Sequence, residues 1–317
     1  MTRPAEIRPK EGAQPGTPFA SFRAGATLRP LRFTLDAEVV EEYTALIGGD
    51  GDWYRSPPGA TGPLAPATTP ALFLLTCLYR TYPPVQGLVL THQALDLVAP
   101  WAPGMEITVR GEITETTERR GRQVVSWAAT FSEAATERLL TRARNTFVLP
   151  PADRQQTLPE MRGPAPAPEG GVAVTPVRLR ETAAGSDRGA RIECAQGIAM
   201  SQPLFDWYGR LNGDLDVVHY DLPYARALGY RAPIAHGLMV AGYLSEMLRQ
   251  AWGLHWLAGG GLAIKWTAPV FPDDVILPIA ELEPVDGSVS PPRLRAHVRC
   301  ENASGAPVLV GEASIPV

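Results

Sequence analysis

An internal repeat constrains the fold of this 317-residue chain more than any other feature. Three blocks of the first half align, in the same order, with three blocks of the second: 46–55 with 210–219, 65–70 with 232–237, and 99–104 with 268–273. The spacing between the copies drifts by only a few residues, as loop insertions would cause. We therefore interpret the chain as two halves with the same architecture.

The two halves differ at the positions where chemistry would take place. His219 of the second half aligns with Arg55, which cannot act as a base near neutral pH. Gly237 aligns with Pro70, which has no backbone N–H to donate. We interpret the first half as a structural, substrate-cradling copy and the second as the catalytic copy.

A stretch rich in proline and glycine separates the halves. Residues 151–171 have the composition of an exposed linker. The predicted organisation is therefore a first half at 1–150, this linker, and a second half at 172–317.

Each half is predicted to contain one long buried helix and several antiparallel strands. Apolar residues recur at helical spacing in the second half, and the first half has a similar apolar run. The predicted helices are 39–46, 70–82, 203–211 and 238–252, and the predicted strands include 106–113, 124–131, 262–266, 275–280, 294–300 and 308–315. This pattern predicts an α+β fold in which a sheet wraps around a helix, twice, about a pseudo-twofold axis.

Composition excludes several functional classes. The net charge of −4 gives no argument for nucleic acid or an anionic membrane surface. No stretch approaches the apolar length of a membrane span, and the first residues have no apolar core, so we expect a cytoplasmic protein. Cys77, Cys194 and Cys300 are far apart, which favours small buried hydrophobes over disulfides or a zinc site. We expect no metal and no cofactor.

The strongest candidate site lies between 208 and 239. Asp214 and His219 are a plausible acid–base pair. Gly237 opens an apolar helical run, so its N–H is an unpaired donor at a helix N-terminus. An acid, a base and an anion-binding N–H are the groups that enolate chemistry on a thioester requires.

Each candidate also has a purely structural interpretation. Asp214 can form a turn, His219 can be a hydrogen-bonded loop residue, and Gly237 can simply start a helix. We favour catalysis because the three occur together. For Asp216 we weigh equally a role in the site and a role in holding the loop in shape. His236 is interpreted mainly as holding the loop before the helix.

This region resembles the MaoC-like and R-specific enoyl-CoA hydratase family, in its double hot-dog branch. The match is specific from Tyr208 to Met247 and extends through the repeat to the rest of the chain. The residues that carry it are Tyr208, Asn212-Gly213-Asp214, Val218-His219 and Ala235-His236-Gly237.

The resemblance implies a double hot-dog fold and a reaction. That reaction is hydration of 2-enoyl thioesters, or dehydration of 3-hydroxyacyl thioesters, carried on CoA or an acyl carrier protein, with the 3R hand. Asp214 and His219 would be catalytic, and the Gly237 N–H would bind the thioester oxygen. The residues expected around the substrate are Asp216, Tyr208, Asn212 and His236.

Two departures from the family pattern leave alternatives open. Asp216 stands where the family has asparagine, and Val217 where it has proline. A group that can donate has become one that normally only accepts, and its charge can couple with that of Asp214. A cyclase that adds a substrate hydroxyl to the enoyl group is one alternative, and a non-catalytic acyl-binding module is another. A homodimer is optional, because the fused halves already supply a pseudo-dimer.

Overall fold

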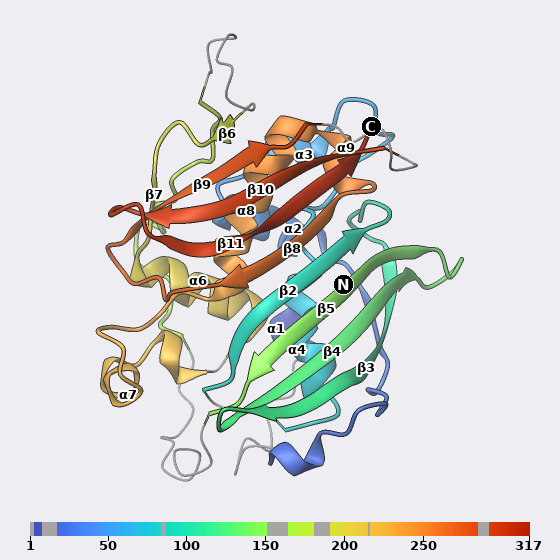
Figure 1. Ribbon diagram of the computed structural model, residues 1–317. Coiled ribbons are helices and arrows are strands. Elements are labelled where there is room, and N and C mark those ends of the chain that lie inside the picture. The colour runs from blue at the N-terminus through green and yellow to red at the C-terminus, as the bar shows by residue number, and fades with distance from the viewer. Residues whose placement is uncertain are drawn as a thin grey trace.

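The protein is built on one antiparallel sheet with helices packed against it (Figure 1). The computed structural model describes residues 3–7, 18–83, 87–150, 164–180, 191–214, 216–284 and 292–317. The strands of the first half are β1 (Leu31–Thr34), β2 (Val89–Leu97), β3 (Glu106–Arg119), β4 (Arg122–Glu133) and β5 (Leu139–Val148). Those of the second are β6 (Arg191–Glu193), β7 (Ile198–Ala199), β8 (Gly261–Trp266), β9 (Val275–Leu282), β10 (Arg293–Asn302) and β11 (Pro307–Pro316).

The strand order repeats on the two sides of a central junction. The sheet runs β1-β3-β4-β5-β2-β8-β11-β10-β9-β6, with β7 also paired to β9. From the junction outwards, the first half has the order β2-β5-β4-β3-β1 and the second half the order β8-β11-β10-β9, with the two short strands β6 and β7 both paired to β9. The halves meet where His92–Asp96 of β2 pairs with Gly261–Lys265 of β8. This order is the structural counterpart of the sequence repeat.

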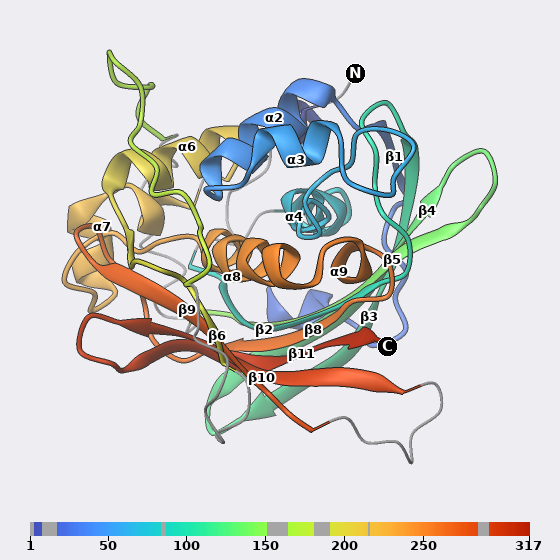
Figure 2. The same ribbon diagram turned by 90° about the horizontal axis from the view of Figure 1, so that it is seen from above.

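The helices gather on one face of the sheet (Figure 2). Viewed from above, α8 lies next to the strands, whereas α2 and α3 lie farther out. The helices are α1 (Pro4–Ile7), α2 (Ala37–Leu46), α3 (Gly51–Arg55), α4 (Ala71–Tyr79), α6 (Gln202–Asn212), α7 (Leu222–Ala227), α8 (Gly237–Trp252) and α9 (Leu254–Leu257), with 3₁₀ turns η1 (Phe19–Ser21) and η2 (Val217–His219). The architecture is the predicted α+β double hot-dog fold.

Helices α4 and α8 are the buried helices of the two halves. Nearly every residue of both is shielded from solvent; α4 is apolar on all sides, whereas α8 also buries the ion pair of Glu246 and Arg249. Gly242 lets α8 approach α2 closely, because a Cβ built there would lie 2.6 Å from Cγ2 of Ile47. Beside this contact, the Tyr243 hydroxyl donates to the Leu46 carbonyl over 2.9 Å. These contacts pack α8 of the second half against α2 of the first half.

Most predicted elements are confirmed, with shifts at their ends. The helix predicted at 70–82 ends at Tyr79, because Pro83 cannot continue a helix and disfavours helical backbone just before it. The three cysteines are buried, as predicted. Of the predicted linker, 151–163 lies outside the described residues, and 164–171 forms neither helix nor strand. None of the helices in the described ranges has the length and apolar character needed to cross a membrane.

Filling the space at Gly242 should destabilise the protein. We expect Gly242→Val to lower the free energy of unfolding by about 1–3 kcal/mol, because the new methyl groups collide with Ile47. Urea denaturation followed by circular dichroism measures this. Gly62→Val is the matched control, since a Cβ at Gly62 has no neighbour within 4 Å. Equal stability of the two variants would contradict the packing argument.

Candidate active site

A cavity of about 270 Å³ is lined by residues of both halves. The first half contributes apolar side chains such as Leu74 and Leu75 of α4 and Phe147 of β5. The second half contributes the polar end. All seven residues singled out from the sequence line this cavity: Tyr208, Asn212, Asp214, Asp216, His219, His236 and Gly237.

The turn after α6 orients Asp214. Gly213 ends the helix in the left-handed conformation, at φ +71°. The side-chain oxygen of Asn212 then accepts the Asp214 N–H at 2.7 Å, and Oδ1 of Asp214 accepts the Asp216 N–H at 3.1 Å. These bonds leave Oδ2 of Asp214 facing two histidines. Asn212 therefore shapes the turn, as expected.

His219 presents an unprotonated nitrogen to the carboxylate. Its Nδ1–H donates to the Ile234 carbonyl over 2.8 Å, which places the lone pair of the neutral ring on Nε2. Nε2 lies 3.9 Å from Oδ2 of Asp214. Burial, reinforced by the nearby charge of His236, lowers the pKa of His219 to about 4. The ring is therefore neutral at pH 7 and able to take up a proton.

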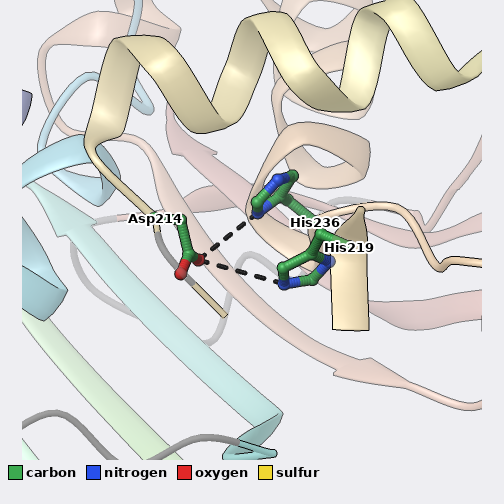
Figure 3. A group of neighbouring side chains, drawn as sticks. All are labelled: Asp214, His219 and His236. Carbon is green, nitrogen blue, oxygen red and sulfur yellow. Dashed lines mark ion pairs between the residues drawn. The ribbon is translucent and has the colours of Figure 1, made fainter. Parts of the chain in front are cut away.

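His236 also faces the carboxylate group of Asp214 (Figure 3). Its Nδ1 is 3.4 Å from Oδ2 of Asp214, and its Nε2 is 3.2 Å from the Tyr220 hydroxyl. That hydroxyl already donates its hydrogen to the Asp214 carbonyl over 2.8 Å, so it accepts from Nε2–H. Nδ1 of His236 and Oδ2 of Asp214 therefore face each other directly.

The two imidazole rings are stacked beside Asp214. Asp214, His219 and His236 each offer one ligand atom, all within 4.8 Å of one another. The ring centroids lie 3.7 Å apart at an interplanar angle of 25°. Nε2 of His219 and Nδ1 of His236 both face Oδ2 of Asp214, at 3.9 Å and 3.4 Å.

The start of α8 lines the cavity. Gly237 is the first residue of this 16-residue helix, and the N–H groups of a first helical turn have no carbonyl partner within their own helix. Trp266 donates its indole N–H to the Gly237 carbonyl over 3.0 Å. A Cβ at position 237 would lie 2.9 Å from that indole nitrogen. Glycine is therefore required where the helix meets the cavity.

Asp216 braces the site loop against the first half of the chain. Its Oδ2 accepts the Gly87 N–H at 2.7 Å, and its Oδ1 accepts the Val218 N–H at 3.2 Å. Burial and the Asp214 charge raise the pKa of Asp216 to about 6, against the attraction of His219. Asp216 thus both brackets the loop and lines the cavity, which combines the two interpretations that the sequence left open.

The corresponding region of the first half lacks this arrangement. Asp50 caps α3 by accepting the N–H groups of Asp52 and Trp53. Arg55 forms an exposed ion pair with Asp52. Arg249 of α8 stacks over the Trp53 ring, with its guanidinium carbon 4.3 Å from the ring centroid. A cationic side chain of the second half therefore covers this loop.

Sequence reasoning missed three contributors to the site. Tyr220, Ile234 and Trp266 orient His236, His219 and Gly237 respectively. Tyr220 could have been flagged because it directly follows the predicted base. Ile234 acts through its carbonyl and Trp266 comes from a distant strand, so neither leaves a local sequence signal.

The protonation of His219 can be measured directly. We expect its imidazole to be neutral and protonated on Nδ1 from pH 7 down to about pH 5, because its pKa lies near 4. ¹⁵N-labelled histidine resonances followed against pH report this, with His219→Gln used for assignment. The urea-unfolded chain is the control, in which histidines titrate near a pKa of about 6.5. A cationic His219 at pH 6 in the folded protein would contradict the described geometry.

Comparison with known proteins shows which families and structures this chain is similar to. Residues 185–287 match the family model of the MaoC-like domain. A search of curated protein sequences found no match. Among solved structures, the chain is similar to a MaoC-like dehydratase, with 17% identity, a TM-score of 0.72, and coverage of 93% of this chain and 98% of the other.

Two further solved structures are similar to this chain over most of its length. A MaoC domain protein dehydratase from Chloroflexus aurantiacus has 17% identity and a TM-score of 0.69, over 95% of this chain and 97% of the other. A conserved hypothetical protein from Mycobacterium tuberculosis, described as having a double hot-dog fold, has 16% identity and a TM-score of 0.62 over the same shares. This chain therefore has the double hot-dog fold, and the match to the MaoC-like domain model lies within its second half.

Proposed function

We propose that this protein hydrates 2-enoyl thioesters, or dehydrates 3-hydroxyacyl thioesters in the reverse direction. One observation carries the proposal: Asp214 and the neutral His219 line the same cavity as the first residue of α8. A base, an acid and a helix N-terminus around one cavity suit a reaction that passes through an enolate. The match to the MaoC-like domain and the dehydratases among similar structures support the same class.

In the proposed mechanism, one water is held between Nε2 of His219 and Oδ2 of Asp214. The water oxygen bonds to Cβ of the enoyl group while His219 takes one of its protons. The negative charge moves to the thioester oxygen, which accepts the Gly237 N–H at the positive end of α8. The enolate formed in this way is then protonated at Cα.

In this mechanism one proton lies between Oδ2 of Asp214 and Nδ1 of His236, and it completes the addition. It passes from the Asp214 carboxyl group to Cα, so that the product gains one hydrogen and one hydroxyl. The proton on His219 then returns to the carboxylate, which restores the starting state. Dehydration follows the same steps in reverse.

The first half of the chain is proposed to cradle the acyl chain. Its contribution to the cavity consists mainly of apolar side chains, including Leu74, Leu75 and Phe147. Burial of alkyl groups against such side chains is favourable by roughly 25 cal/mol per Å² of apolar surface. The thioester carrier is proposed to be CoA or an acyl carrier protein. The assignment of 1–150 and 172–317 as cradle and catalytic halves belongs to this proposal.

Removing the acid or the base should abolish hydration. Crotonyl-CoA and a longer enoyl-CoA are followed by loss of the ultraviolet absorbance of the conjugated thioester. We expect His219→Ala and Asp214→Asn to lower kcat by about 10²–10⁴-fold, the usual contribution of one acid–base group. His297→Ala is the matched control, because that exposed histidine pairs with Glu283 and does not line the cavity.

The outcome also separates the alternatives. Full activity of His219→Ala would end the proposed mechanism. If wild-type protein leaves both substrates unchanged, a cyclase acting on a hydroxyl-bearing enoyl thioester becomes the better description. Tight acyl-CoA binding without any turnover would favour a non-catalytic acyl-binding module.

Asp216 should set the acid limb of the pH profile. Below a pKa of about 6 its carboxyl group is protonated and accepts the Gly87 and Val218 N–H groups less strongly, so activity should fall. Asp216→Asn does not titrate and keeps an amide oxygen as acceptor. We expect kcat/KM of this variant to be reduced only a few fold at pH 8 and to lose the decline near pH 6. An unchanged decline would assign it to another group.

A further inference from the structure

Three polar side chains lie next to one another on the inner face of the sheet in the first half. Asn145 of β5 is paired in register with Gln93 of β2 on one side and with Trp127 of β4 on the other. Paired residues of neighbouring strands point to the same face, and each of these three is 2% exposed or less. They form a buried polar row among apolar neighbours, which we name the Gln93–Asn145–Trp127 row.

The row leaves several hydrogen-bonding atoms unused. The Gln93 side-chain NH₂ donates to Oδ1 of Asn145 over 3.1 Å. Within the described part of the chain, Oε1 of Gln93, Nδ2 of Asn145 and Nε1 of Trp127 have no hydrogen-bond partner. Buried polar atoms are nearly always paired in folded proteins, because an unpaired one loses its bond to water without compensation. The described residues therefore leave room for a partner at this row, such as a bound ligand.

Asn145 connects this row to the cavity of the site. It lines the cavity together with Phe147 of the same strand and Leu75 of α4. The histidines and Asp214 belong to the other half of the chain and line the same space. A molecule that fills this cavity therefore meets the catalytic groups and an unpaired amide donor.

We propose, resting on the function proposed above, that the acyl chain of the substrate carries a hydroxyl group that hydrogen-bonds to Asn145. The hydroxyl oxygen accepts from Nδ2 of Asn145, and its hydrogen is available to Oε1 of Gln93. A keto group would satisfy only the donor, and a plain alkyl chain would satisfy neither. Turning both amides by half a rotation exchanges donor and acceptor, and a hydroxyl group still fits.

Binding of unreactive ligands tests this without turnover. The probes are a saturated medium-chain acyl-CoA and its positional isomers with one hydroxyl beyond the γ carbon, titrated into wild-type protein by calorimetry. We expect one isomer to bind about tenfold more tightly than the plain chain, because an unmatched buried amide rejects a chain that lacks the hydroxyl. Asn145→Leu should abolish this preference and bind the plain chain at least as tightly as wild type.

Two controls separate packing and folding from recognition. Phe147→Leu changes the same stretch of the cavity but leaves the amide pair intact, so it should alter all affinities alike. Gln93→Leu with Asn145→Leu removes both partners together and should unfold at a temperature close to that of wild type, whereas Asn145→Leu alone leaves Gln93 unpaired.

The results distinguish this inference from the proposed function. Equal affinity of wild type for the plain chain and every isomer would overturn the inference and assign the row to buried water, and a preference that survives in Asn145→Leu would also overturn it. Enoyl-CoA hydration would be untouched by either result. Failure of every acyl-CoA to bind would instead count against both proposals.

Discussion

The pairing of β2 with β8 is the contact on which the rest of the structure depends. It joins two five-residue segments, His92–Asp96 and Gly261–Lys265, and so turns two half-sheets into one. Because the halves share a sheet, their helices are forced onto one face and pack against each other. Residues of α4 and α8 then line one cavity, to which the second half contributes Asp214, His219 and His236.

Two copies of one architecture have diverged in opposite directions. In the second half, a glycine that lines the cavity starts the buried helix. In the first half, Pro70 precedes the buried helix and has no N–H. A buried ion pair of α8 lies against the first half. Glu246 accepts from Arg249, and it also accepts from the Tyr54 hydroxyl of the first half over 2.8 Å. Removing one member of this network would leave a costly unpaired charge.

Sequence reasoning was most successful where the signal is local or repeated. The buried helices, the late strands and the turn carrying Asp214 follow from apolar spacing, glycine positions and comparison of the two halves. The role of His236 could not be inferred in this way, because its contact with Asp214 depends on how the loop before α8 folds back over η2. The Asp216–Gly87 bond and the Asn145–Gln93 pair join residues far apart in the chain. Their partners became evident only from strand register and loop packing.

The bond from Asp216 to Gly87 has a consequence for how such a protein can change over time. A loop of the second half takes its shape partly from a backbone N–H donated by the first. Exchanging the second half for one without an acceptor at the position of Asp216 would therefore leave the site loop without this brace, even if both parents fold well. The two halves are thus constrained to change together at this contact.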